Sequence, residues 1–160
     1  MSKKVARYAL LVALAMVLSW LESMIVIPGL LPGMKVGLAN LAVIFALYRL
    51  SLKEAAAISF VRVMLVSLTF GNAYSLAYSL AGAVLSMAVM AGLKKLNKFS
   101  ILGVSVAGGV CHNIGQILVA IAVLETTRLG WYLPPLLVSG TVAGIVIGAA
   151  GGVLTDRVRV

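Results

Sequence analysis

The sequence PGLLPGMKVGLANL, from Pro28 to Leu41, is the one break in the chain that neither hydrophobicity nor helix propensity explains. Its two Pro-Gly pairs stop a helix and permit tight turns, and Lys35 and Asn40 then lead into the next apolar run. Elsewhere the apolar runs are joined by very short connections. The pattern predicts a loop and a helix start at the outer mouth of a membrane bundle, where they partly cover a ligand site.

The composition predicts an integral membrane protein. Of the 160 residues, 62% are hydrophobic and only 11% are charged, which is more apolar surface than a soluble domain of this size buries. The net charge of +9 comes from short basic clusters between the apolar runs, as in the cytoplasmic flanks of membrane helices. We therefore expect a multi-pass protein of a prokaryotic cytoplasmic membrane that does not bind nucleic acid.

Six apolar runs approach the roughly 20 residues that a spanning helix needs. They predict a single all-α membrane domain over residues 1–160, without a second soluble domain. The expected helices cover about residues 7–27, 34–50, 52–70, 73–93, 100–124 and 131–154.

The distribution of lysine and arginine predicts that both termini are cytoplasmic. Ten of these residues flank the inner helix ends, whereas only Lys35 and Arg128 lie at outer ends, and cytoplasmic flanks carry the excess of positive charge. The outer face then carries the Pro-Gly loop, the turn at Gly71 and Asn72, and the loop from Glu125 to Gly130.

Small residues at four-residue spacing predict close helix packing. On the last helix they are glycines, namely Gly140, Gly144, Gly148 and Gly152. The first helix has a similar stripe at Ala15, Ser19 and Ser23, and a shorter one nearer its cytoplasmic end at Ala9 and Ala13.

Polar residues inside the predicted spans indicate a cavity, because they are costly in hydrocarbon unless they face a partner, water or ligand. They come from four helices and all lie at mid-depth or nearer the outside. His112 and Gln116 are four residues apart and share a helical face, with Asn113 beside it. The candidate substrate-binding residues are Glu22, Lys35, Asn40, Arg62, Asn72, His112, Asn113 and Gln116.

A structural role remains open for five of these residues. In that alternative, Glu22 and Arg62 form a purely structural ion pair and His112 bonds to a neighbouring carbonyl. Asn40 then caps a helix or bridges two helices, and Lys35 is only an interfacial anchor. Their common depth favours a binding site, since independent structural polar residues would scatter across both leaflets.

Missing motifs argue against catalysis. The chain has no GxxxxGK[ST] loop for ATP, and its one aspartate, Asp156, does not supply the clustered aspartates with which prenyl diphosphate synthases hold magnesium. A single histidine excludes a metal site of several histidines. We expect a protein that is not an enzyme and that needs no cofactor or metal.

The stretch PGMKVGLANL, the six short helices and the length resemble the Gx transporter family, also described as heptaprenyl diphosphate synthase component I. That family is similar to the S components of energy-coupling factor (ECF) transporters, which bind micronutrients from outside. The resemblance implies that residues Pro28 to Lys35 cap a ligand. It also implies that Ala9 and Ala13 match the AxxxA stripe that docks a transmembrane coupling subunit.

Two functions follow as expectations. The first is a substrate-binding subunit that takes up a small polar or anionic molecule through Arg62, Lys35 and His112, while partner ATPase subunits hydrolyse ATP. The alternative is a non-catalytic membrane partner in polyprenyl diphosphate or quinone metabolism, in which the apolar bundle holds a lipid tail. A polar ligand near the outer loop favours transport, and a chain between helices favours the alternative.

Overall fold

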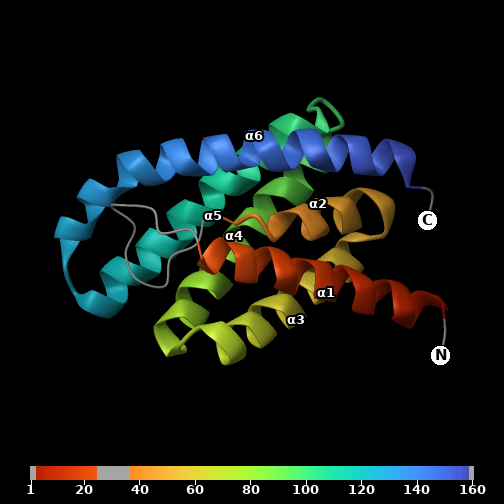
Figure 1. Cartoon of the computed structure of the whole chain (residues 1–160). Helices are drawn as coiled ribbons and strands as arrows, with labels where there is room; N and C mark the ends of the chain where they lie inside the picture. The colour runs from red at the N-terminus through yellow and green to blue at the C-terminus, as the bar shows by residue number, and fades with distance from the viewer. Residues whose placement is uncertain (1–2, 25–36, 159–160) are drawn as a thin grey trace.

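The computed structural model describes residues 3–24 and 37–158, and within these ranges the protein is all-helical without a strand. Figure 1 shows the helices running roughly along one long axis, and α1 begins and α6 ends at the same end of the bundle. The elements are α1 Lys3–Ser23, α2 Asn40–Arg49, α3 Leu52–Phe70, α4 Ala73–Leu96, α5 Ile101–Leu124, the 3₁₀ helix η1 Thr127–Tyr132, and α6 Leu133–Arg157.

Side-chain caps start three of the helices. The hydroxyls of Ser51 and Ser100 and the amide oxygen of Asn72 each accept a hydrogen bond from a backbone N–H in the first turn of α3, α5 and α4, respectively. These caps satisfy donors that the helix itself leaves unpaired. Asn97 ends α4 in the left-handed conformation, with φ 52°, which asparagine tolerates better than most residues.

The predicted helix bounds agree best where a cap is visible in the sequence. The predicted helix bounds 52–70 match those of α3, and the predicted starts and ends of α4, α5 and α6 differ from the observed ones by no more than three residues. The predicted second helix is wrong over residues 37–39, which form a turn, so that α2 begins at Asn40, while the predicted start at Met34 lies outside the described residues. Gly37 has φ +97° there, a conformation open mainly to glycine.

Glycines bring α5 and α6 together. A Cβ on Gly144 would lie 2.5 Å from the Cα of Val106, and one on Gly148 would lie 2.7 Å from the Cα of Leu102. Gly140 likewise meets the backbone of α5 at Gly109, so three of the four predicted small positions form the contact. The fourth, Gly152, has no such neighbour within 4 Å among the described residues.

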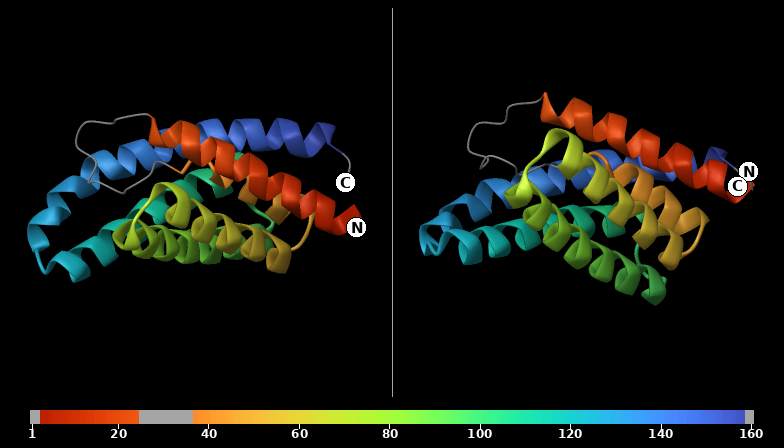
Figure 2. Two further views of the ribbon diagram at one scale, coloured as in Figure 1. Left: turned by 60° about the horizontal axis from the view of Figure 1, so that its bottom comes forward. Right: turned by 90° about the horizontal axis from the view of Figure 1, so that it is seen from below.

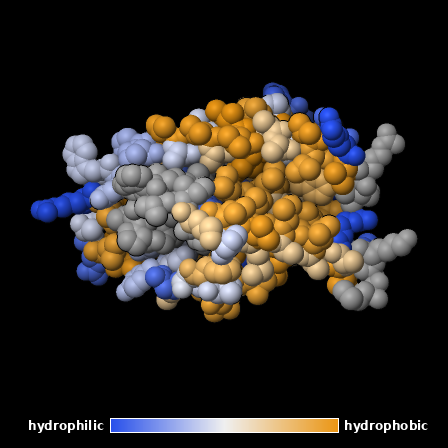
Figure 3. Space-filling model, in the orientation of Figure 1, coloured by the Kyte–Doolittle hydropathy of each residue, from blue (hydrophilic) through white to orange (hydrophobic). Residues whose placement is uncertain are grey.

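Among the described residues, four helical segments are long and apolar enough to cross a membrane, which indicates a multi-pass membrane protein. They are Lys4–Glu22, Ala73–Leu96, Ile101–Leu124 and Thr127–Arg157. In Figure 3 an apolar surface covers the middle of the molecule and hydrophilic residues gather towards its ends. The number of spans, six, and the cytoplasmic side of the termini stay predictions.

The two other helices differ from this group in length or charge. The 10 residues of α2 reach roughly 15 Å, about half the hydrocarbon thickness of a bilayer. The 19 residues of α3 include Lys53, Glu54 and Arg62. Both lie against longer helices: α2 packs on α1, α3 and α6, and α3 packs on α1 and α4.

Candidate functional site

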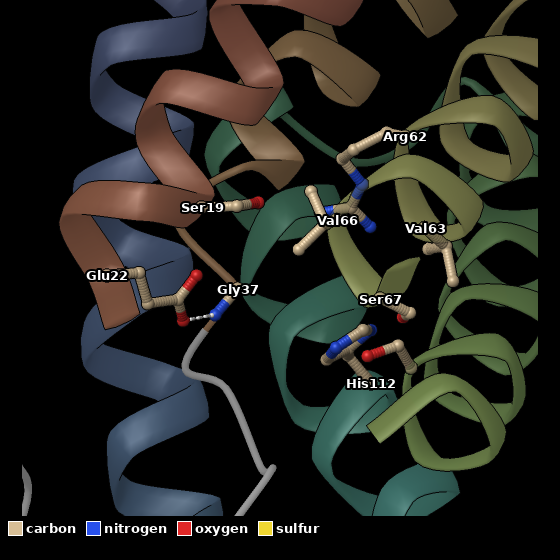
Figure 4. Close-up of a pocket in the computed structure, with 9 residues that line it drawn as sticks. Ser19, Glu22, Gly37, Arg62, Val63, Val66, Ser67 and His112 are labelled. Carbon is tan, nitrogen blue, oxygen red and sulfur yellow. Dashed lines mark hydrogen bonds between the residues drawn. The ribbon is translucent and has the colours of Figure 1, made fainter. Parts of the chain in front are cut away.

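A small polar cavity lies where α1, α3, α4 and α5 meet the start of the α2 segment. Its volume of about 20 Å³ is room for about one water molecule. Figure 4 shows side chains from separate helices directed towards this space, with Glu22 and Arg62 on opposite sides of it. The described residues that line it are Ser19, Glu22, Gly37, Arg62, Val63, Val66, Ser67, Ser79 and His112.

Arg62 brings a permanent positive charge into this cavity. Only 5% of its surface is exposed, and no atom in the described part of the chain accepts a hydrogen bond from its Nε. The carboxylate of Glu22 interacts favourably with the guanidinium, which lowers the cost of burying the charge. The fork of donors on arginine suits a planar oxyanion, so Arg62 keeps capacity for a further acceptor.

Glu22 joins the end of α1 to the turn at residues 37–39, which leads into α2 and which we call, together with α2, the α2 segment. Its carboxylate is buried, and its Oε1 accepts a hydrogen bond from the backbone N–H of Gly37 (Figure 4). A Cβ on Gly37 would lie 2.9 Å from the Asn40 amide nitrogen. The positive φ and this close approach both explain why a glycine closes the cavity at this position.

His112 and Ser67 supply two more buried polar atoms that have no hydrogen bond within residues 3–24 and 37–158. His112 is 3% exposed and Ser67 is 5% exposed. His112 Nδ1 lies close to the Gly82 backbone, but the geometry is not that of a hydrogen bond. Ser67 Oγ also has no partner among the described residues. Buried polar atoms are nearly always paired, yet three residues that line this cavity each carry a buried polar atom with no hydrogen bond to the described residues.

The structure brings together three of the eight predicted site residues, namely Glu22, Arg62 and His112. Asn40 is buried next to Gly37 but does not line the cavity. Lys35 lies outside the described residues. Asn72 is exposed and caps α4, so the structure does not support its assignment to the site.

The two remaining candidates on α5 belong to a different contact. Asn113 donates hydrogen bonds to the Leu136 carbonyl oxygen at 2.6 Å and to Ser139 Oγ at 3.3 Å, both on α6. Gln116 donates to Asn113 Oδ1 at 3.5 Å. Successive residues of a helix point about 100° apart. His112 therefore lines the cavity, whereas Asn113 faces α6.

Sequence reasoning missed most of the residues that complete the cavity wall. They are Gly37, Val63, Val66, Ser67 and Ser79, whereas Ser19 was assigned only to a packing stripe. Helical spacing carried a usable signal. Val66 follows Arg62 by four residues and Ser19 precedes Glu22 by three, so each shares a helix face with a buried charge, whereas Ser67, five residues after Arg62, does not.

The predicted docking stripe on α1 faces outward. Ala9 and Ala13 are both exposed, and Ala9 lines a groove of about 430 Å³ between α1 and α3. At this groove the Tyr8 hydroxyl donates a hydrogen bond to Glu54, which joins the two helices. The stripe therefore lies on a surface that a second helix can reach.

Comparison with known families identifies one match over nearly the whole chain. A family model described as heptaprenyl diphosphate synthase component I matches residues 11–154. Searches of curated proteins and of solved structures find no significant match.

Proposed function

Because the chain belongs to the heptaprenyl diphosphate synthase component I family, we propose one function for the whole matched membrane domain. It is the substrate-binding subunit of an ECF-type transporter that takes up a small polar or anionic micronutrient. The observation that carries this proposal is that three residues lining a single cavity, Arg62, Ser67 and His112, each have a buried polar atom without a hydrogen bond in the described part of the chain.

The charge and chemistry of the cavity favour a ligand with an acidic or strongly accepting group. Arg62 only donates hydrogen bonds, and the hydroxyls of Ser67 and Ser79 can donate as well. Valines 63 and 66 supply an apolar wall. Polar groups that are few and convergent in an apolar wall are typical of small-molecule sites.

Ligand entry requires the cavity to enlarge. The present 20 Å³ is far below the roughly 300 to 1,000 Å³ of ordinary ligand pockets. The hydrogen bond between Glu22 and Gly37 joins α1 to the α2 segment beside the cavity, so separating these two elements would widen it. Uptake in this proposal therefore couples ligand binding to movement at the Glu22–Gly37 contact.

The exposed stripe at Ala9 and Ala13 supports a transmembrane coupling subunit as partner, with separate ATPase subunits as the energy source. Small exposed residues let another helix approach closely. The stripe and the cavity lie towards opposite ends of α1, so a partner on the stripe leaves the ligand site free.

The test is the small molecule that the purified protein retains. Detergent-purified wild type, Arg62→Ala and Arg49→Ala are denatured, and the released compounds are measured by mass spectrometry. We expect wild type and Arg49→Ala, which removes an exposed arginine, to carry the same compound. Arg62→Ala should bind this compound roughly 10- to 150-fold more weakly and therefore retain less of it, since a hydrogen bond to a charged group contributes about 1.5 to 3 kcal/mol.

Two results contradict the proposal. One is a wild-type protein that carries no small molecule after purification from cells in rich medium. The other is Arg62→Ala protein that melts normally and retains the same compound at wild-type occupancy. An Arg62→Ala protein that is destabilised and is rescued by Glu22→Ala would instead identify a structural ion pair.

The family description favours a second candidate, a non-catalytic partner in polyprenyl diphosphate metabolism. In that case the chain should co-purify with a prenyl-transferring subunit and raise its activity. Co-purification with membrane coupling and ATPase subunits, without a prenyl-transferring subunit, would exclude this candidate.

A further inference from the structure

A second, apolar groove runs between α3 and α4, away from the polar cavity. We call it the α3–α4 groove. Its volume is about 370 Å³, and its wall is almost entirely aliphatic and aromatic. The residues that line it are Leu52, Ala56, Ser59, Phe60, Leu80, Ala83, Val84, Met87, Ala88 and Ala91. None of them lines the polar cavity.

The length of the α3–α4 groove matches one leaflet of a bilayer. Its wall extends from Leu52 to Phe60 on α3 and from Leu80 to Ala91 on α4, which is roughly 12 to 17 Å at the rise of a helix. The hydrocarbon core of a bilayer is about 30 Å thick. A lipid chain from one leaflet therefore fits this length, and a chain of seven isoprene units is longer than the groove.

Two exposed lysines follow the last groove residue of α4, Lys95 within the helix and Lys98 just after its end. Lys95 follows Ala91 by four residues, which places it one turn further along the same face of α4. Lys95 and Lys98 are both exposed. Lys94 is held elsewhere, because it donates to the Leu47 carbonyl oxygen and lies 5.0 Å from the centre of the Tyr48 ring.

We propose that the α3–α4 groove binds one acyl chain of an anionic phospholipid, whose phosphate contacts Lys95 and Lys98. The apolar wall accepts the chain, and the two lysines select the anionic head group over a zwitterionic one. Lysines near a membrane surface attract anionic lipids in this way. This lipid site is separate from the polar cavity and does not depend on the transport proposal.

The first test compares two lipids on the full-length protein. Delipidated protein is titrated with dioleoylphosphatidylglycerol or dioleoylphosphatidylcholine, and retained lipid is counted by native mass spectrometry. Wild type should retain one phosphatidylglycerol in preference to phosphatidylcholine. Each lysine contributes a factor of about 5 to the affinity, so the double variant Lys95→Ala/Lys98→Ala should bind phosphatidylglycerol about 25-fold more weakly. Lys4→Ala, which removes an exposed lysine of α1, should bind as wild type.

The second test fills the groove. Ala88→Trp places a large ring at an exposed position of the wall and should abolish lipid retention. The matched control is Ala149→Trp, at an exposed position of α6, which should leave retention unchanged. The two variants are compared only if their melting temperatures match that of wild type. If Ala88→Trp misfolds, the lysine variants still test the proposal.

Three outcomes would overturn the proposal. The first is equal retention of phosphatidylglycerol and phosphatidylcholine by wild type. The second is unchanged retention in the double lysine variant. The third is displacement of phosphatidylglycerol by geranylgeranyl diphosphate at equimolar concentration, which would make a prenyl diphosphate the occupant.

Discussion

The two halves of this bundle are held together in different ways. In the half formed by α4, α5 and α6, glycines let helix backbones touch. Gly115 lies against Ala81 of α4 and Gly144 lies against Val106 of α5. In the half formed by α1, α2 and α3, side chains rather than bare backbone make the contacts. The polar cavity and both apolar grooves border α3 in this second half.

This difference separates a rigid support from a binding region. Backbone contact leaves no space for a ligand and resists any change of volume. The half built on α3 borders the cavity and both grooves and has a hydrogen bond between segments at Glu22 and Gly37. It carries two of the four buried polar atoms that have no hydrogen bond in the described part of the chain, on Arg62 and Ser67, and the other two are on Ser86 of α4 and His112 of α5. His112 extends from the support into the cavity, so α5 belongs to both halves.

The largest expected effect comes from adding a methyl group where helix backbones touch. A Cβ at Gly144 would lie 2.5 Å from Val106 Cα, so Gly144→Ala must move a backbone. We expect the free energy of unfolding to fall by about 1 to 3 kcal/mol or more, measured by denaturant titration in one detergent. The control, Gly152→Ala, meets no described atom within 4 Å and should be neutral or stabilising by up to about 1 kcal/mol. Equal effects would remove the distinction between the halves.

The next effect concerns the polar contact inside the rigid half. Asn113 is fully buried and bonds Leu136 and Ser139 of α6. Asn113→Ala leaves a buried carbonyl with fewer donors, and the unfolding free energy should fall by about 1 to 3 kcal/mol. Asn97→Gly, at an exposed left-handed position, should be neutral or slightly stabilising. A loss below about 0.5 kcal/mol for Asn113→Ala would show that glycine contacts alone hold α6.

A smaller effect, of opposite sign, is expected for an unpaired hydroxyl in the binding half. Ser67→Ala removes a buried oxygen that has no partner among the described residues. The unfolding free energy of the ligand-free protein should stay unchanged or rise by up to about 1 kcal/mol, because burial of an unpaired polar group is unfavourable. Ser100→Ala, which removes the α5 cap, should instead cost about 1 kcal/mol. Destabilisation by Ser67→Ala would mean that its hydroxyl supports the fold.

The smallest effect on stability belongs to the outer face of α1. Ala9→Leu/Ala13→Leu changes two exposed positions, so the melting temperature should not change. The double variant should nevertheless lose the coupling subunit in affinity purification, because leucines prevent close helix approach. Ala122→Leu, at an exposed position of α5, should keep it. Retention of the partner by the double variant would locate docking elsewhere.

Composition and local sequence patterns were enough to predict the class of protein and the bounds of most helices. The apolar composition indicates a membrane protein, and the caps at Ser51, Asn72 and Ser100 set the starts of α3, α4 and α5. These features depend only on nearby residues. The glycine spacing on α6 likewise identified a packing face, three of whose four glycines contact α5.

The tertiary structure decided which polar residues meet. The sequence grouped His112 with Asn113 and Gln116, yet His112 enters the cavity and Asn113 binds α6. The sequence also did not indicate Ser67 or Ser79 as neighbours of Arg62. Helical periodicity tells which residues share a face, but not which helix that face meets. In a membrane, lipid chains are as apolar as the helix faces, so hydrophobicity does not select the helix against which a given face packs. The pairing of helices depends instead on close packing between segments that are distant in the sequence.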